Sequence, residues 1–358
     1  MRIVIIGASG NVGTALLRRL HETHPGDRLV GIVRRPPEPV GVYRDVEWHA
    51  LNVAAPSAVQ ELGRLFAGAD AVVNLAWGFQ PTRSVDYLER VGVGGTTAVL
   101  AAAQSAGVGH LVHMSSVGTY APGRYGDHVD EKWATTGVRT SPYSRHKSTA
   151  ETLIDEHELL HGSDSVPIAR MRPGFIIQRA AASGLTRYGL PAYVPVRLVP
   201  LLPLLPLDRG LRVPLVHSDD VADAIVRVIE QRATGPFNIA ADQPLTRDDV
   251  AEALGARTVH VPSAILGPLI ALTWRARLQP VDRGWLDMAF TLPLMDCTRA
   301  RTELGWAPAW TPKDALADLL DGISHLAHTE SAPLRRRSVL DLLRRDIAEG
   351  LISTRELP

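Results

Sequence analysis

The chain of 358 residues has a single cysteine, Cys297, and so cannot form an internal disulfide. We therefore expect a reducing compartment, the cytoplasm. No signal peptide is recognisable at the start, because Met1-Arg2 leads straight into an apolar run without a charged n-region or a cleavage site. That absence favours the same location.

Net charge is lacking as well. Lysine plus arginine and aspartate plus glutamate both number 38, so the overall electrostatic field favours neither nucleic acid nor an acidic membrane as a partner.

The most apolar stretch, Val194–Leu207, contains four prolines and one arginine, which excludes it as a membrane-spanning helix. We expect a small-molecule partner, no membrane partner and no bound metal.

What the sequence does contain begins at the N-terminus with a strand, a glycine turn and a helix. The apolar run Ile3–Ile6 precedes Gly7-Ala-Ser-Gly-Asn-Val-Gly13, and a helical pattern follows from Thr14 to His21. Glycines let the backbone approach a pyrophosphate closely, and the N–H groups and dipole of the helix stabilise its charge. We predict that the turn binds a dinucleotide through Gly7, Ser9, Gly10, Asn11, Val12 and Gly13.

Apolar strand-like runs alternate with helical segments through the first half of the chain, including a long helical segment at Leu88–Ala106. The predicted strands are Ile3–Ile6, Arg28–Arg34, Glu47–Leu51, Ala71–Leu75, His110–Ser115 and Ile168–Arg172. Apolar strands between helices indicate a parallel sheet covered on both faces. The fold class is therefore α/β, a doubly wound parallel Rossmann sheet that binds ligands at the C-terminal strand ends.

The pattern becomes less regular after Arg172, where proline and glycine are frequent. We expect a helix at Ser218–Glu230, a short strand at Phe237–Ala240 and a helix at Thr246–Leu254. The predicted organisation is a Rossmann domain at 1–173, a smaller, mainly helical substrate-binding cap at 174–330, interleaved with it, and an extension at 331–358. In that extension Ser338 is a good N-cap, and Leu340, Leu343 and Ile347 recur at the spacing of an amphipathic helix.

Three residues suggest proton transfer. Tyr143 and Lys147 lie four residues apart, on one face of a helix, so that the ammonium should lower the pKa of the phenol. Ser116 follows a predicted strand, and its hydroxyl would hold a substrate oxygen while a hydride moves to or from the adjacent carbon. A surface helix with Tyr and Lys four apart by chance is the alternative for this pair alone. The glycine turn at the other end of the chain favours the catalytic interpretation.

The second predicted strand ends in Arg34 and Arg35, where an NAD-selective enzyme places a carboxylate for the ribose 2′-hydroxyl. Guanidinium groups suit a 2′-phosphate by charge and by bidentate hydrogen bonding. We therefore expect NADP(H) to be preferred, with NAD(H) possible. Two arginines of a solvated loop are the alternative. Asn52, after the third strand, is expected to accept a hydrogen bond from the adenine amino group.

These motifs together resemble the extended short-chain dehydrogenase/reductase superfamily, in particular the NAD-dependent epimerase/dehydratase family. The resemblance runs from Met1 to about residue 323. Further segments that carry it are Ala71–Ala76, Gly95-Thr96, Arg172–Gly174, Val216–Ala224, Phe237–Ala240 and Leu304–Pro308. The family motif Asn-Val-x-Gly-Thr reads Gly92-Val-Gly-Gly-Thr96 here, so a relay water ordered by that asparagine is not expected.

The resemblance implies roles for single residues. Ser116, Tyr143 and Lys147 are the implied catalytic residues, and Lys147 also holds the nicotinamide ribose. The implied cofactor contacts beyond the glycine turn and the arginines are Asn52, Val53, Leu75, Ala76, Trp77, Met114, Ser115, Tyr143, Lys147, Pro173, Gly174, Phe175 and Ile176. The expected substrate contacts are Trp77, Gly78, Ser116, Tyr120 and Tyr188.

Three functions remain open from the sequence. The first is an NADP(H)-dependent oxidoreductase acting on a ketone, aldehyde or secondary alcohol of a small, mainly apolar molecule, because the region between Ser183 and Leu207 is strongly aliphatic. The second is a nucleotide-sugar epimerase or dehydratase with a transiently reduced cofactor. Arg212 stands at the offset of the diphosphate-binding arginine of related epimerases, but the aromatic and the acid that follow it are missing. The third is a non-catalytic NADP-sensing module. A homodimer is possible.

Overall fold

The computed structural model describes residues 1–78, 84–124, 126–189, 201–336 and 340, without the side chains of 187–189. Its centre is a parallel sheet of seven strands in the order β12-β7-β5-β4-β1-β2-β3. The strands are β1 (Arg2–Ile6), β2 (Arg28–Val33), β3 (Val46–Ala50), β4 (Ala71–Asn74), β5 (Leu111–Met114), β7 (Ile168–Pro173) and β12 (Gly235–Ile239). The strand order reverses between β1 and β4, and such a switch point opens a ligand crevice at the carboxyl ends of the strands.

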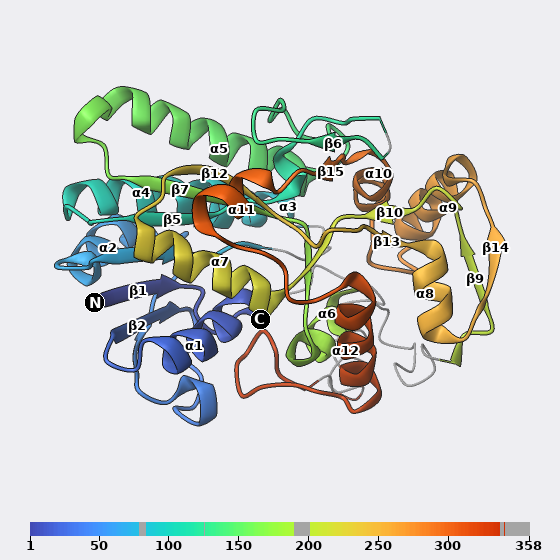
Figure 1. Ribbon diagram of the computed structural model, residues 1–358, viewed down its shortest axis with the longest axis horizontal. Coiled ribbons are helices and arrows are strands. Elements are labelled where there is room, and N and C mark those ends of the chain that lie inside the picture. Colours follow the sequence, from blue (N-terminus) through green and yellow to red (C-terminus); the bar gives the residue numbers. More distant parts are fainter. Residues whose placement is uncertain (79–83, 125, 190–200, 337–339, 341–358) are drawn as a thin grey trace.

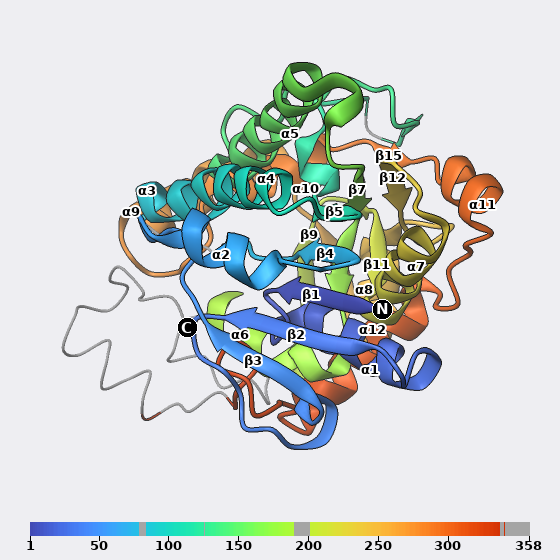
Figure 2. The same cartoon turned by 90° about the vertical axis from the view of Figure 1, so that its left-hand side faces the viewer.

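Helices cover both faces of this sheet (Figure 2). On one face lie α1 (Asn11–Thr23) and α7 (Ser218–Gln231), and on the other lie α2 (Ala58–Phe66), α4 (Gly95–Ser105) and α5 (Pro142–His161). Each helix turns an apolar stripe to the sheet, and the strands β1, β2, β4, β5 and β7 are almost wholly buried, whereas the edge strand β3 is partly exposed. Because both faces are covered, the strands are continuous apolar runs rather than alternating ones.

A smaller, mainly helical cap lies at one end of the sheet (Figure 1). Its helices are α6 (Ala182–Gly189), α8 (Arg247–Leu254), α9 (Ser263–Arg275), α10 (Arg283–Thr291) and α12 (Pro312–Ser324). Short strands pair within or beside the cap: β8 (Phe175–Ile177) with β11 (Leu215–His217), β9 (Leu204–Leu207) with β14 (Arg257–His260), β10 (Arg212–Val213) with β13 (Leu245–Thr246), and β6 (His128–Val129) with β15 (Leu294–Met295). The remaining helices are α3 (Val85–Glu89) and α11 (Thr298–Leu304).

The predicted fold class is confirmed, and the six predicted strands of the first half lie within about one residue of the observed ones. The predicted helix at Leu88–Ala106 differs: it is formed by α3, a π-helical turn at Arg90–Gly94 and α4. Strand β12 joins the main sheet from beyond residue 173, so the two regions interleave. The division at 173 stays a prediction, and the amphipathic helix after Ser338 falls, except for Leu340, outside the described residues.

Two positions of the glycine turn, Gly7 and Gly13, have no room for a side chain. Gly7 has a φ of +79°, and a Cβ there would approach the Leu75 carbonyl carbon to 3.0 Å. A Cβ on Gly13 would lie 2.4 Å from the carbonyl oxygen of Ala8. The first turn of α1 therefore packs directly on the backbone of the loop that precedes it.

Gly13→Ala should destabilise the protein by about 1–3 kcal/mol, because the added methyl meets backbone atoms that cannot rotate away. Urea unfolding followed by circular dichroism measures this. The control is Gly63→Ala in α2, where a Cβ has no neighbour nearer than the Ser105 Oγ at 3.9 Å. There the better helix propensity of alanine should stabilise by about 0.5–1 kcal/mol. Equal effects of the two substitutions would contradict the packing argument.

Candidate active site

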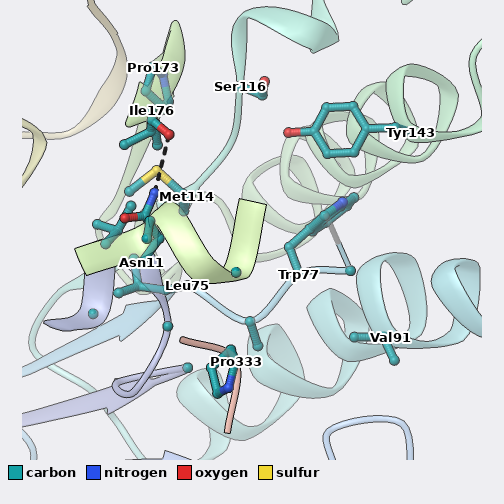
Figure 3. Close-up of a pocket in the computed structure, with 18 of the residues that line it drawn as sticks. Asn11, Leu75, Trp77, Val91, Met114, Ser116, Tyr143, Pro173, Ile176 and Pro333 are labelled. Carbon is teal, nitrogen blue, oxygen red and sulfur yellow. Dashed lines mark hydrogen bonds between the residues drawn. The ribbon is translucent and has the colours of Figure 1, made fainter. Parts of the chain in front are cut away.

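An elongated cavity of about 640 Å³ follows the carboxyl edge of the sheet from the end of β2 to the cap. Figure 3 shows its middle, with Leu75 and Met114 at strand ends, Asn11 at the start of α1, and Ser116 and Tyr143 facing each other across it. All of the predicted cofactor residues line it. They are Gly7, Ser9, Gly10, Asn11, Val12, Gly13, Arg34, Arg35, Asn52, Val53, Leu75, Ala76, Trp77, Met114, Ser115, Tyr143, Lys147, Pro173, Gly174, Phe175 and Ile176.

The lining suits a dinucleotide. At the glycine turn the backbone borders the cavity without intervening side chains, as close approach of a pyrophosphate requires. Arg34 and Arg35 are exposed side chains at the far end, and Arg34 Nη1 donates to the Tyr87 hydroxyl at 2.9 Å. No carboxylate lines the cavity among the residues that the structure describes. A bound phosphate therefore meets cations and amides but no acid.

Asn11 ties the glycine turn to the strand that follows β7. Its Nδ2 donates to the Ile176 carbonyl at 3.2 Å, a bond drawn in Figure 3. Its Oδ1 accepts from Gln178 Nε2 at 2.7 Å and from Ser218 Oγ at 2.9 Å. The side chain therefore joins α1, β8 and α7 around the cavity, a structural role in addition to the predicted contact with the cofactor.

The three predicted catalytic residues come together. Ser116 lies two residues after β5, which ends at Met114, and its Oγ accepts from the Gly118 N–H at 3.0 Å. Tyr143 lies in the first turn of α5, which begins with Ser141 as N-cap and Pro142 at N1. The Ser116 hydroxyl and the Tyr143 phenol oxygen point toward one another, as Figure 3 shows. Lys147, one turn further along α5, is buried, and its Nζ donates to the Met114 carbonyl at 2.7 Å.

The predicted lowering of the Tyr143 pKa by Lys147 is not found. Burial raises the pKa of Tyr143 to about 12, and the hydrogen bond with Ser116 only partly opposes this. Burial also holds the pKa of Lys147 well below its usual value, against the attraction of Glu151. Lys147 does not contribute to the shift of the Tyr143 pKa, and its Nζ donates to the Met114 carbonyl instead. At neutral pH Tyr143 is therefore a protonated phenol, the form that a proton donor needs.

Two tryptophans flank Tyr143. Trp77, just after β4, meets it edge to face with ring centroids 6.4 Å apart, and Trp285 of α10 lies at 5.3 Å with the ring planes tilted by 30°. The face of the Trp77 indole also covers the Lys147 ammonium, 3.5 Å from Nζ to the ring centroid. The proton-transfer residues thus lie between an aromatic side chain of the Rossmann domain and one of the cap.

One turn after Lys147 on α5, Glu151 forms a buried ion pair with Arg172 of β7. Its two oxygens accept from Arg172 Nε at 2.8 Å and from Nη2 at 2.9 Å. Ser115 Oγ donates to Oε1 of the same carboxylate at 2.5 Å, and Arg170 Nη1 donates to its Oε2 at 3.2 Å. Burial opposes ionisation of this carboxyl, but Arg172 outweighs it and lowers the pKa of Glu151 to about 2. The pair locks α5 onto β7 and the end of β5.

One predicted substrate contact is wrong. Tyr120 is fully buried outside the cavity, where its hydroxyl donates to Asn238 Oδ1 at 2.6 Å and accepts from Arg172 Nη1 at 3.1 Å. It extends the Glu151 network instead of facing a ligand. Trp77, Gly78 and Ser116 do line the cavity. The side chain of Tyr188 lies outside the described residues.

Two other predicted cofactor contacts, Ser115 and Asn52, line the cavity but use their side chains for hydrogen bonds within the protein. Ser115 borders it, but its hydroxyl is directed to Glu151. Asn52 uses Oδ1 to accept from the Ala54 N–H at 3.1 Å, which orders the loop after β3.

Several lining residues escaped the sequence analysis. Trp285, Met288 and Ala289 come from α10, Leu292 directly follows that helix, and Ala332, Pro333 and Leu334 come from the C-terminal extension. None of them carries a local motif, since they reach the cavity only through long-range packing. Glu151 did offer a signal, because it follows Lys147 by four residues and so lies on the same face of α5.

Part of the chain matches a known family. Residues 3–174 match the model of the family described as "NAD dependent epimerase/dehydratase family". The predicted resemblance is thereby confirmed.

Curated relatives extend the likeness beyond residues 3–174. An uncharacterized protein of Mycobacterium tuberculosis (strain ATCC 25618 / H37Rv) is 26% identical over 96% of this chain but only 33% of its own length. The chain thus spans about a third of the length of the first curated relatives it matches. dTDP-glucose 4,6-dehydratase of Streptomyces griseus is 27% identical over 90% of this chain and 92% of its own.

Solved structures of the family share the fold. UDP-glucose 4-epimerase of Thermus thermophilus, solved as a complex with NAD, superposes with a TM-score of 0.67. The alignment covers 90% of this chain and 99% of that one, at 19% identity. Among the described residues, no helix is long and apolar enough to span a membrane.

Glu151→Gln should destabilise the protein by about 3–5 kcal/mol, because it leaves the Arg172 guanidinium buried without its counter-charge. A depressed pKa also predicts a pH dependence. The contribution of Glu151 is complete above its ordinary pKa of 4.5 and disappears as the pH falls toward about 2. Urea unfolding at several pH values from 7 downward measures both effects.

The control for this experiment is Glu303→Gln, which removes the half-exposed partner of Arg299. An exposed pair contributes only about 0–1 kcal/mol, so this variant should stay close to the wild type. If Glu151→Gln lost no more stability than the control and kept the acid sensitivity of the wild type, the buried pair would not have the role assigned to it.

Proposed function

We propose that the chain is an NAD(P)-dependent enzyme that oxidises or reduces a carbon bearing oxygen, with Tyr143 as the general acid or base. The observation that carries this proposal is that the Ser116 and Tyr143 hydroxyls point toward one another in the cavity that the glycine turn lines. Both hydroxyls face one space, as Figure 3 shows. A substrate oxygen placed there receives hydrogen bonds from both.

The roles follow from the geometry. The Tyr143 phenol, protonated at neutral pH, donates its proton to a carbonyl oxygen in the direction of reduction and takes it back in the direction of oxidation. The Ser116 hydroxyl orients that oxygen. Lys147 donates one hydrogen bond to the Met114 carbonyl, and its remaining N–H groups would bind the ribose hydroxyls of the cofactor. The nicotinamide, when bound, supplies or accepts the hydride.

The cofactor that we propose is NADP(H), with NAD(H) as the weaker ligand. Arg34 and Arg35 at the end of the cavity, without a lining carboxylate, support this preference by charge. The relatives solved with bound nucleotide contain NAD, so the specificity of this chain rests on its own arginines.

For the reaction itself, the relatives favour a nucleotide-sugar epimerase or dehydratase. The dTDP-glucose 4,6-dehydratase of Streptomyces griseus aligns over most of both chains, and the structural neighbours include several UDP-sugar 4-epimerases. In such a reaction the cofactor is reduced and reoxidised within one turnover. We take this as the first candidate.

A second candidate, net oxidation or reduction of an apolar carbonyl or alcohol, is favoured by the lining of the cap side. The residues there are Ala181, Gly184, Leu185, Val213, Pro214, Leu245, Trp285, Met288, Ala289 and Leu292. Within the described part of this wall no cation is available for a sugar diphosphate. Arg212 is exposed and outside the lining. Such a wall suits an apolar molecule.

The cellular location, the roles of the two regions and the oligomeric state are also part of the proposal. We place it in the cytoplasm, because its only cysteine, Cys297, is a buried free thiol. The Rossmann region supplies the nucleotide site and the region after residue 173 the substrate wall. A homodimer would bury Leu159 and Leu160, which are 86% and 79% exposed at the end of α5.

NADPH should bind on the order of tenfold to a hundredfold more tightly than NADH, since a charge-assisted contact to phosphate contributes about 1.5–3 kcal/mol. Fluorescence titration of the reduced nucleotides measures the ratio. The double substitution Arg34→Ala, Arg35→Ala should remove most of the preference and leave NADH affinity nearly unchanged. Equal affinities in the wild type would refute the NADP assignment.

The reaction class is decided by cofactor stoichiometry. Absorbance of the reduced nicotinamide is followed while the enzyme meets a panel of nucleotide sugars and apolar carbonyl compounds, and products are identified by mass spectrometry. An epimerase or dehydratase converts substrate with no net change in absorbance, whereas a reductase consumes one NADPH per product.

Tyr143→Phe should reduce turnover by about 10²–10⁴-fold at unchanged nucleotide affinity. Turnover within a few-fold of the wild type would remove Tyr143 from the mechanism.

A further inference from the structure

The Lys147 ammonium has a defined environment. Its side chain is 2% exposed, its Nζ donates to the Met114 carbonyl at 2.7 Å, and the Trp77 ring centroid lies 3.5 Å from Nζ. An ammonium over an indole face is attracted by the ring quadrupole, most strongly where water is excluded. The carbonyl and the indole therefore restrict the directions in which the remaining N–H groups can point.

Trp77 can lie over the ammonium only because residue 92 is a glycine. A Cβ on Gly92 would come within 2.8 Å of Cζ2 and 2.9 Å of Cη2 of the indole, closer than real Cβ contacts. Gly92 is in the middle of the π-helical turn Arg90–Gly94, a rare distortion that changes which residues of a helix face a neighbour. The turn and the missing side chain together make the space that the indole occupies.

We propose that Trp77 is a positioning residue for Lys147, held over the ammonium by its close packing on Gly92. The indole restricts the position of the ammonium and keeps water from its covered side. The same ring meets Tyr143 edge to face, so one side chain orders both groups. This inference rests on the proposed role of Lys147 as a ligand of the cofactor.

The test is a double-mutant cycle on nucleotide binding, which needs no substrate. NADPH affinity is measured by fluorescence titration for the full-length wild type, Trp77→Leu, Lys147→Met and the double variant. Trp77→Leu removes the π face and should weaken binding on the order of tenfold. In the Lys147→Met background the same substitution should change affinity by less than about twofold, because the ammonium that the indole positions is gone.

Conservative and matched variants separate positioning from mere filling of space. Trp77→Phe keeps a ring face and should retain most of the affinity. Gly92→Ala leaves the indole in the protein but displaces it, so its affinity should resemble that of Trp77→Leu. Gly94→Ala, two residues further in the same turn, is the control: a Cβ there has no neighbour within 4 Å, and wild-type affinity is expected.

Each outcome decides the matter. If Trp77→Leu weakens binding by the same factor with and without Lys147, or if leucine and phenylalanine behave alike, the indole is only a wall and the inference is wrong. If Lys147→Met alone leaves affinity unchanged, the proposed cofactor role of Lys147 fails, and the inference with it. Thermal unfolding monitors the fold, and Gly92→Ala replaces Trp77→Leu in the cycle if the leucine variant does not fold.

Discussion

The bidentate ion pair between Glu151 and Arg172 is the contact on which the geometry of the site depends. It joins α5 to β7, and the Ser115 hydroxyl adds the end of β5 to the same carboxylate. Desolvation offsets much of the attraction in a buried pair, so its net contribution to stability is modest. Its effect is on orientation: Tyr143 and Lys147 lie on the same helix, one to two turns from Glu151. When that helix is fixed in rotation, the phenol and the ammonium are fixed with it.

Most of the sheet and of the nucleotide site could be predicted from the sequence, because their signals are local. A parallel strand buried on both faces is a continuous apolar run, and a ligand site at the switch point is built from the few residues after each strand. The glycine turn, the end of β2 and the Ser116 segment all lie at such positions. Their assembly into one cavity follows from the strand order alone.

The cap and the buried network could not be predicted in the same way. Tyr120 has the aromatic ring and hydroxyl expected of a substrate contact, and only its bonds to Asn238 and Arg172, distant in sequence, show that it is interior. Trp285 reaches Tyr143 through the packing of α10, which no periodicity specifies. The influence of Lys147 on Tyr143 was likewise inferred from spacing, whereas the ammonium is engaged by the Met114 carbonyl and the Trp77 indole.

The segment Ala332–Leu334 gives the cavity a wall that lies far from the glycine turn in the sequence. It is tied to the beginning of the chain through Tyr43, whose hydroxyl donates to Thr329 Oγ1 at 2.8 Å and also pairs with Thr14 Oγ1 at 3.0 Å. A ribosome therefore releases the glycine turn and the catalytic helix long before the pocket is closed. During translation the Rossmann strands can pair, but the nucleotide site acquires its full enclosure only when residues 332–334 have emerged as well. Its final form thus depends on a segment more than 300 residues downstream of the glycine turn.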